Sequence, residues 1–236
     1  MMASMARPPR DDSYESYRAK IEAYFDSTAL DAWKQLTSDT PVSRIRATVR
    51  AGRDAMRQTL LGWLPEDMRG LRLLDAGCGT GALAVEAARR GADVVAIDVS
   101  AQLVNVARER AAANLAIDWR VGDMADPGLG EFDHVVAMDS VIHYQLADVV
   151  NVASSLGART RGSLLFTFAP STAALEMLWA VGRIFPRGDR APAIVPIKKS
   201  KLEAALLAAL PGLAIGRDAR ISSGFYKSHA LEVRRA

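Results

Sequence analysis

Three glycines lie close together in the stretch LLDAGCGTGALA, between an apolar run and a segment of helical character. Gly77, Gly79 and Gly81 permit a tight turn there, and they let the backbone approach a ligand that a Cβ atom would obstruct. Gly77, Gly79 and Ala82 also satisfy the loose dinucleotide-binding pattern G-x-G-x-x-A. The loop therefore predicts a ligand held against the backbone, and by itself it does not distinguish a dinucleotide from another cofactor.

Three carboxylates come at the ends of the apolar runs around this loop. Asp75 directly precedes the glycines, Asp98 ends the next apolar run, and Asp123 follows the third run in VGDM. Carboxylates in these places suit a ligand with an ammonium group, a ribose diol and an adenine amine, whereas several of them would repel a pyrophosphate. The charges thus favour a ligand of the first kind over a dinucleotide.

Short apolar runs alternate with helical segments through the middle of the chain. This alternation is typical of βαβ units around a buried parallel sheet, so it predicts a doubly wound α/β fold. Two later runs, 214–221 and 226–234, are close enough to pair as a hairpin, which predicts an antiparallel strand at the sheet edge. The strands predicted for the repeat are 71–77, 92–100, 117–124, 132–140 and 162–170, with helices over 81–90, 101–113 and 146–160.

Two segments lie outside this repeat, and both are candidates to cover the carboxyl edge of the sheet, where open α/β folds bind ligands. Residues 13–65 read as two or three helices that form a lid, and residues 171–200 read as an apolar helix followed by a Pro-rich loop. Residues 1–12 are predicted to be a disordered lead-in, because they lack the apolar core of a signal peptide. The ligand-binding domain is expected to span residues 66–236.

Composition limits the kind of protein. A chain of 236 residues suits one domain with additions. The sequence has no run of about 18 apolar residues that would span a bilayer, and a net charge of +3 is too small to argue for nucleic acid. The single cysteine, Cys78, agrees with a reducing compartment, so a cytoplasmic protein is expected. Cys78 lies inside the glycine loop and is interpreted as structural, not nucleophilic.

An aromatic stripe marks the start of the predicted lid. Tyr14, Tyr17, Ile21 and Tyr24 follow the spacing of one helix face. For Tyr14 and Tyr17, packing against the domain is at least as good an interpretation as contact with a ligand. By spacing alone, the purpose of the stripe stays open, and packing is the better interpretation.

Arginines form a second stripe in the predicted lid. Arg46, Arg50, Arg53 and Arg57 recur at steps of four, three and four, which places them within a narrow arc of a helix. Such a stripe fits a solvated face, an anionic membrane patch or a clamp for carboxylates. Together with the aromatic stripe, it indicates a flat, acidic ligand.

The loop and its carboxylates resemble the class I S-adenosylmethionine methyltransferases, which have a D-x-G-x-G-x-G loop and acids after strands two and three. The resemblance implies a Rossmann-like seven-stranded sheet with a reversed last strand. It also implies that the glycine loop holds the methionine part of the cofactor, that Asp98 binds the ribose hydroxyls, and that Asp123 and Met124 contact the adenine. The whole set implied to bind the cofactor is Asp75, Gly77, Cys78, Gly79, Thr80, Gly81, Asp98, Val99, Asp123, Met124 and Asp139.

The end of the fourth predicted strand reads MDSVIHY over residues 138–144. Methyltransferases that act on the amino groups of bases or amides have Asn-Pro-Pro-Tyr or a close relative there, so this segment argues against such a substrate. His143 and Tyr144 follow the strand tip, where a helper group would face the transferred methyl group. The alternative for His143 is a hydrogen-bonded surface residue, and we favour the functional interpretation.

Longer strings are similar to the magnesium protoporphyrin IX O-methyltransferases of chlorophyll and bacteriochlorophyll synthesis, namely YFDSTALDAWKQLTSD, PVSRIRATVRAGRDAMR, VIHY, IFP and SSGFYKSHALE. The resemblance implies methyl transfer from S-adenosylmethionine, which becomes S-adenosylhomocysteine, to one propionate of a magnesium porphyrin. It implies Tyr24 and His143 as catalytic residues. The candidates to bind the porphyrin are Trp33, Arg46, Arg50, Arg53, Tyr144, Trp179 and Phe185, and for the segment with Trp179 and Phe185 capping of the core is an equally good interpretation.

The same resemblance carries expectations about metals and partners. The magnesium is carried by the substrate, and no protein-bound metal is expected, because the three histidines show no ligand spacing. Handover from the magnesium chelatase and peripheral contact with the photosynthetic membrane are expectations at the level of the family, and no nucleic acid is expected. Two alternatives stay open: a methyltransferase for another small carboxylic acid or phenol, and a porphyrin carrier that keeps the fold. His143 is open as a base, an orienting group or a magnesium ligand.

Overall fold

The computed structural model describes residues 12–28, 34, 37, 41, 43–171 and 193–235 of the chain. Of the predicted lead-in over residues 1–12, residues 1–11 lie outside these ranges, and Asp12 is the first residue of a helix. Trp33 and most of the predicted insertion, with Trp179 and Phe185, lie outside them as well. What the sequence predicts for these residues therefore stays a prediction.

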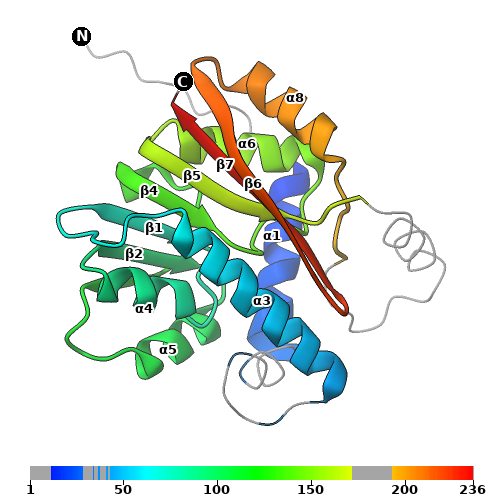
Figure 1. Ribbon diagram of the computed structural model, residues 1–236. Helices are drawn as coiled ribbons and strands as arrows, with labels where there is room; N and C mark the ends of the chain where they lie inside the picture. Colours follow the sequence, from blue (N-terminus) through cyan, green and yellow to red (C-terminus); the bar gives the residue numbers. More distant parts are fainter. Residues whose placement is uncertain are drawn as a thin grey trace.

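Seven strands form one sheet in the order β3-β2-β1-β4-β5-β7-β6, which confirms the predicted doubly wound α/β fold (Figure 1). The first five strands are parallel, and β1 pairs with both β2 and β4, so its carboxyl end lies at the centre of the sheet edge. The strands are β1 (Arg72–Ala76), β2 (Asp93–Asp98), β3 (Ile117–Val121), β4 (Phe132–Ala137), β5 (Thr160–Phe168), β6 (Leu213–Ser223) and β7 (Tyr226–Arg235).

The predicted hairpin is present, but its antiparallel strand is not the edge strand. Strand β7 runs antiparallel to β5 and is inserted between β5 and β6, so that β6 forms the edge of the sheet. Burial agrees with this order, since eight of the ten residues of β7 are buried or half-buried, whereas β6 has half-buried and exposed positions and no buried one.

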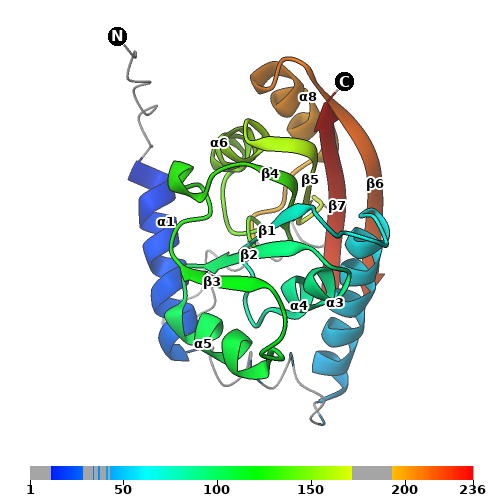
Figure 2. The ribbon, with the colours of Figure 1, turned by 90° about the vertical axis from the view of Figure 1, so that its left-hand side faces the viewer.

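Helices cover both faces of the sheet and build two separate apolar cores. Helices α1, α6 and α8 contribute to one core and α3 and α4 to the other, and Figure 2 shows α1 and α3 on opposite sides of the sheet. No helix within the described residues is long and apolar enough to cross a bilayer. The helices are α1 (Asp12–Ala23), α3 (Arg44–Gly62), α4 (Ala82–Arg89), α5 (Ala101–Arg110), α6 (Leu146–Gly157) and α8 (Lys199–Ala209), with a π-helical turn η1 (Tyr24–Thr28) and a 3₁₀ turn η2 (Pro127–Leu129).

Helix α3 lies against the β6–β7 hairpin at a point where no side chain would fit. A Cβ atom added to Gly52 would lie 2.5 Å from Cδ1 and 2.8 Å from Cβ of Tyr226 in β7. Near the start of the helix, the Ser223 hydroxyl donates to the Thr48 carbonyl at 2.9 Å. The missing side chain at Gly52 therefore allows the arginine-bearing helix to approach the sheet closely.

Replacing Gly52 by alanine tests this close approach. In an ordinary helix interior, the change would stabilise by up to about 1 kcal/mol. Here the added methyl group meets the root of the Tyr226 side chain, which no ring rotation moves away, and overpacking of this kind costs about 1–3 kcal/mol. We expect Gly52→Ala to lower the free energy of unfolding, measured by urea denaturation.

Gly62→Ala in the same helix is the matched control, because a Cβ atom there meets no atom within 4 Å. This variant should be as stable as the original chain or slightly more stable. If Gly52→Ala were as stable as Gly62→Ala, the close approach of α3 to Tyr226 would be wrong.

Candidate active site

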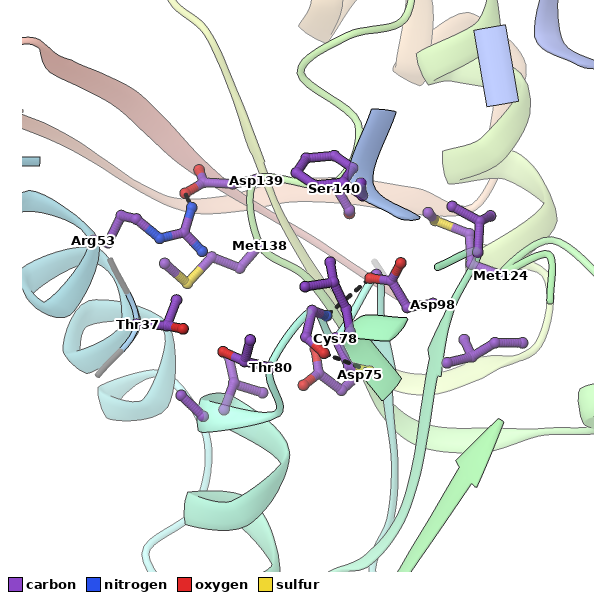
Figure 3. A pocket seen from close by; sticks show the side chains of 18 of the residues that line it. Thr37, Arg53, Asp75, Cys78, Thr80, Asp98, Met124, Met138, Asp139 and Ser140 are labelled. Carbon is purple, nitrogen blue, oxygen red and sulfur yellow. Dashed lines mark hydrogen bonds and ion pairs between the residues drawn. The ribbon is translucent and has the colours of Figure 1, made fainter. Parts of the chain in front are cut away.

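A cavity of about 260 Å³ opens at the carboxyl ends of β1, β2 and β4. The glycine loop after β1, Asp98 at the end of β2, residues 138–140 after β4 and one face of α3 line it (Figure 3). Parallel strands bring their carboxyl ends to one edge of the sheet. The fold therefore brings together the loop and the acids that the sequence places at the ends of separate strands.

The glycine loop is fixed by hydrogen bonds to β2. The N–H groups of Gly77 and Cys78 donate to the Ile97 carbonyl at 2.8 and 3.0 Å, and the Gly79 N–H donates to Asp98 Oδ2 at 2.8 Å. Burial raises the pKa of the Cys78 thiol well above its usual range, with added repulsion from Asp98. The thiol therefore stays protonated, and protonated thiols are poor nucleophiles.

Gly77 lies where the glycine loop passes the loop after β4. Its φ angle is +82°, and an added Cβ atom would lie 2.3 Å from Cβ of Ser140. Only glycine satisfies both the backbone conformation and the available space. The hydroxyl oxygen of Ser140 is buried and has no hydrogen-bond partner among the described residues, although Ser140 lines the cavity. A ligand with a polar group at this point would satisfy that hydroxyl.

Asp98 joins the glycine loop to the start of α5. Its Oδ1 accepts the Ser100 N–H at 3.0 Å, while its Oδ2 accepts from the glycine loop. Burial raises the pKa of the Asp98 carboxyl. The Ser100 hydroxyl in turn donates to Asp26 of η1 at 2.5 Å, so the turn that follows α1 is attached directly beside the predicted ribose site.

Asp75 is buried below the glycine loop, where its Oδ2 accepts the N–H of Ala84 in the first turn of α4 at 3.1 Å. Burial raises the pKa of Asp75 to about 7; the Ala84 hydrogen bond opposes the rise and repulsion from Asp98 adds to it. Near neutral pH this carboxyl is therefore divided between its protonated and ionised forms.

Asp123 is engaged by helix α1, which sequence reasoning missed. The Tyr14 hydroxyl donates to Asp123 Oδ1 at 2.8 Å, and the Ala125 N–H donates to the same oxygen at 2.8 Å. The Tyr14 ring also stacks on Tyr144 at a centroid distance of 5.1 Å, and Tyr17 meets Tyr144 edge-on at 6.5 Å. The expected packing of Tyr14 and Tyr17 is therefore present. A contact between Asp123 and an adenine stays a prediction, while the neighbouring Met124 lines the cavity.

The two residues implied to be catalytic lie in different places. His143 is buried and lines the cavity, and its Nδ1 lies 3.3 Å from the Ala193 carbonyl. Tyr24 is half-buried in η1 and packs edge-on against the neighbouring Phe25 ring at 5.2 Å. Phe25 lines the cavity, whereas Tyr24 does not. The catalytic role predicted for Tyr24 is not tested by this placement.

The arginine stripe faces the cavity over part of its length. Arg50, Arg53 and Arg57 line the cavity, whereas Arg46 lies nearer the start of α3 and does not. Arg57 Nη2 lies 2.8 Å from Asp54, and Arg53 Nη1 lies 2.6 Å from Asp139. The positive charge on this wall is thus partly neutralised within the protein.

Most residues implied to bind the cofactor line the cavity, and two do not. Gly81 is the N-cap residue of α4, and Asp123 is turned toward Tyr14. Among the described residues, no group of His, Cys, Asp and Glu side chains has the arrangement of a metal site. Residues that line the cavity and that the sequence did not single out include Phe25, Met138 and Ser140; Ser140 stands in the quoted MDSVIHY segment, but nothing in its type distinguishes it there.

Comparison with known proteins identifies the family. A family profile described as "Magnesium-protoporphyrin IX methyltransferase C-terminus" matches residues 137–235, and a "Methyltransferase domain" profile matches residues 73–160. The magnesium-protoporphyrin O-methyltransferase of Rhodobacter capsulatus is 47% identical over 94% of this chain and 98% of its own length. The chain belongs to the magnesium-protoporphyrin O-methyltransferase family.

Other members of the magnesium-protoporphyrin O-methyltransferase family agree in sequence and structure. The chloroplastic magnesium protoporphyrin IX methyltransferase of Arabidopsis thaliana is 29% identical over 90% of this chain and 69% of its own length. The crystal structure of magnesium protoporphyrin IX methyltransferase (ChlM) from Synechocystis PCC 6803 with bound SAH superposes with a TM-score of 0.81, at 29% identity over 92% of this chain and 99% of that one. The family resemblance drawn from the sequence is confirmed.

The raised pKa of Asp75 predicts a pH-dependent stability. Between the unfolded value near 3.8 and the folded value of about 7, the folded state binds more protons than the unfolded state, so stability falls as pH rises through this window. Asp75→Asn removes this titration and keeps the acceptor for Ala84. The free energy of unfolding of the variant, relative to the original chain, should rise by about 2–3 kcal/mol between pH 5 and pH 8. If urea denaturation gave the same difference in free energy of unfolding between the two proteins at every pH in this range, Asp75 would not be a buried carboxyl with a raised pKa.

Proposed function

We propose that the protein transfers a methyl group from S-adenosylmethionine to one propionate carboxylate of magnesium protoporphyrin IX, giving the monomethyl ester. The observation that carries the proposal is the extent of the similarity to the Rhodobacter capsulatus enzyme. It covers 98% of that enzyme's length, and so it includes α1 and α3 as well as the cofactor-binding sheet that many methyltransferases share. Elements outside the shared fold are those that give such enzymes their substrates.

The residues at the cavity fit S-adenosylmethionine. Gly77 and Gly79 line the cavity, where they would lie beside its amino-acid part, and the unsatisfied hydroxyl of Ser140 lies against the same loop. Asp98 at the end of β2 has a carboxylate suited to a ribose diol, and Met124 lines the cavity beyond it. When bound, the cofactor supplies a methyl group on a positively charged sulfur.

The reaction requires no general base. A propionic acid with a pKa of about 4.3 is more than about 99% ionised at neutral pH, so the carboxylate oxygen is itself the nucleophile. That oxygen forms the new O–C bond while the S–C bond breaks, and the bonding electron pair stays on the sulfur, which becomes a neutral thioether. The protein contributes by holding the oxygen in line with the methyl group, and positioning of this kind supplies roughly 7–11 kcal/mol.

Charge neutralisation in the reaction decides what the arginines do. An arginine bound to the reacting oxygen would stabilise the ionised reactant more than the transition state, in which the negative charge is already disappearing, and it would slow the reaction. The arginines of α3 that line the cavity therefore bind the other propionate of the substrate. Their partial neutralisation by Asp54 and Asp139 supports a role in holding a second carboxylate without drawing the first one away from the methyl group.

His143 orients the substrate in this proposal. Because the Ala193 carbonyl only accepts, Nδ1 of His143 carries the proton, and in the neutral ring Nε2 is then an acceptor. An acceptor nitrogen suits an axial ligand of the substrate's magnesium, whereas donation to a carboxylate requires the imidazolium form. Both roles place the porphyrin, and neither removes a proton.

The direct test of the function uses labelled S-adenosylmethionine and magnesium protoporphyrin IX. Incubation with the protein should produce a labelled monomethyl ester, which chromatography separates from the substrate. Calorimetry with S-adenosylmethionine alone provides the control for the cofactor site. Cofactor binding without a labelled ester would favour a methyltransferase for another acid or phenol. Absence of cofactor binding would favour a porphyrin carrier. Either result would overturn the proposal.

Replacement of His143 separates positioning from base catalysis. His143→Asn removes the imidazole ring but leaves the substrate's carboxylate ionised, so we expect a partial loss of about 10- to 100-fold in single-turnover rate with little change in S-adenosylmethionine affinity. A general-base mechanism predicts almost no turnover and a rate that rises with the concentration of an added buffer base. An almost complete loss of turnover in His143→Asn would contradict the positioning role.

A further inference from the structure

The carboxylate of Asp139 receives donors from three different elements. Besides Arg53 of α3, Thr167 of β5 and Ser228 of β7 donate their hydroxyls to Oδ1 at 3.0 and 3.2 Å. The Tyr226 hydroxyl lies 3.1 and 3.0 Å from Oδ1 and Oδ2. The side chain of Asp139 is only 5% exposed. A carboxylate with this many donors is held in a single orientation.

The backbone at Asp139 is also unusual. Its φ angle is +53°, and it is the one non-glycine residue with positive φ among the described residues. Its N–H donates to the Thr167 hydroxyl at 2.7 Å. A non-glycine residue in this region carries a conformational cost that the surrounding contacts must offset, and such residues concentrate at functional sites. The geometry therefore points to a task for Asp139 beyond filling space.

The position of Asp139 connects the arginine wall to the predicted reaction centre. Arg53 reaches from α3 to Asp139 at the rim of the cavity, as Figure 3 shows. His143 follows on the same loop and lines the same cavity. The loop thus sets the distance between a fixed guanidinium and the residue expected beside the reacting carboxylate.

We propose that Asp139 is a positioning residue that holds Arg53 as the receptor for the carboxylate that is not methylated, and that this pair limits the reaction to one carboxylate per substrate molecule. The inference rests on the proposed function. A guanidinium presents its N–H donors in one rigid plane, and the bond to Asp139 fixes how that plane faces the cavity.

The limit to one methylation follows from charge. To react a second time, a monoester would have to turn round and place its neutral ester against Arg53. The charge-assisted hydrogen bonds of the first binding mode would then be lost. A site built to hydrogen-bond one substrate group rejects an analogue that lacks it far more strongly than a purely apolar pocket does. Discrimination against the monoester should therefore depend on Arg53 and on its partner.

The test compares kcat/KM for the diacid, magnesium protoporphyrin IX, with kcat/KM for its isolated monomethyl ester. The original chain should prefer the diacid strongly. Arg53→Met should reduce that preference about 10- to 100-fold, chiefly by raising KM for the diacid. Asp139→Asn keeps the size of the side chain and should act in the same direction, and Arg53→Lys should retain part of the preference because it keeps the charge without the planar fork.

The ratio of the two substrates separates positioning from mere stability, because a loosened fold would lower both rates alike. Glu131→Gln is the control: Glu131 forms an exposed ion pair with Arg161 on another part of the molecule, and its loss should leave the ratio unchanged. If Asp139→Asn did not fold, Arg53→Met would still decide the question. A preference that Arg53→Met leaves intact, or an original chain that esterifies both carboxylates readily, would overturn the inference. Absence of methylation of either porphyrin would instead overturn the proposed function.

Discussion

Two loops pass each other at the carboxyl edge of the sheet without room for a side chain between them. Gly77 of the first loop faces Ser140 of the second. The two loops that meet at this contact have different roles. The glycine loop, fixed to β2 through Ile97 and Asp98, shapes the cofactor side of the cavity. The second loop places Asp139 against α3 and His143 against the cavity. A shift at this one contact would therefore move the cofactor and the acceptor relative to each other.

The N-terminal helices are attached to this edge at separate points. Tyr14 connects α1 to the loop after β3 through Asp123, Asp26 connects η1 to the start of α5, and Arg53 connects α3 to the loop after β4. The anchoring groups are polar and lie around the rim of the cavity, while the apolar faces of α1 and α3 pack on opposite sides of the sheet. The N-terminal helices are thus held by residues that follow the carboxyl ends of β2, β3 and β4.

The fold and the cofactor side were predictable because they depend on local patterns. Alternating apolar runs predict parallel strands, and parallel topology alone brings Asp75, Asp98 and the glycine loop to one edge. The partners of Asp139 were not predictable, since Arg53 and Tyr226 lie 86 and 87 residues away along the chain and meet it only once α3 has docked on β7. The inner position of β7 was not predictable either, because a hairpin pattern shows that two strands pair with each other but not which of the two pairs with β5.

Because β7 lies inside the sheet, the two sides of the cavity form at different times during synthesis. Strands β1 to β5 and the glycine loop leave the ribosome first and contain the contacts that form the cofactor side of the cavity. The carboxylate of Asp139 has to wait for Tyr226 and Ser228, which arrive near the end of the described chain on the strand that completes the sheet. A nascent chain would therefore acquire its cofactor-binding half early and the geometry that holds Arg53 only after the last hairpin has closed, so that a partly made enzyme lacks the arrangement assigned to porphyrin recognition.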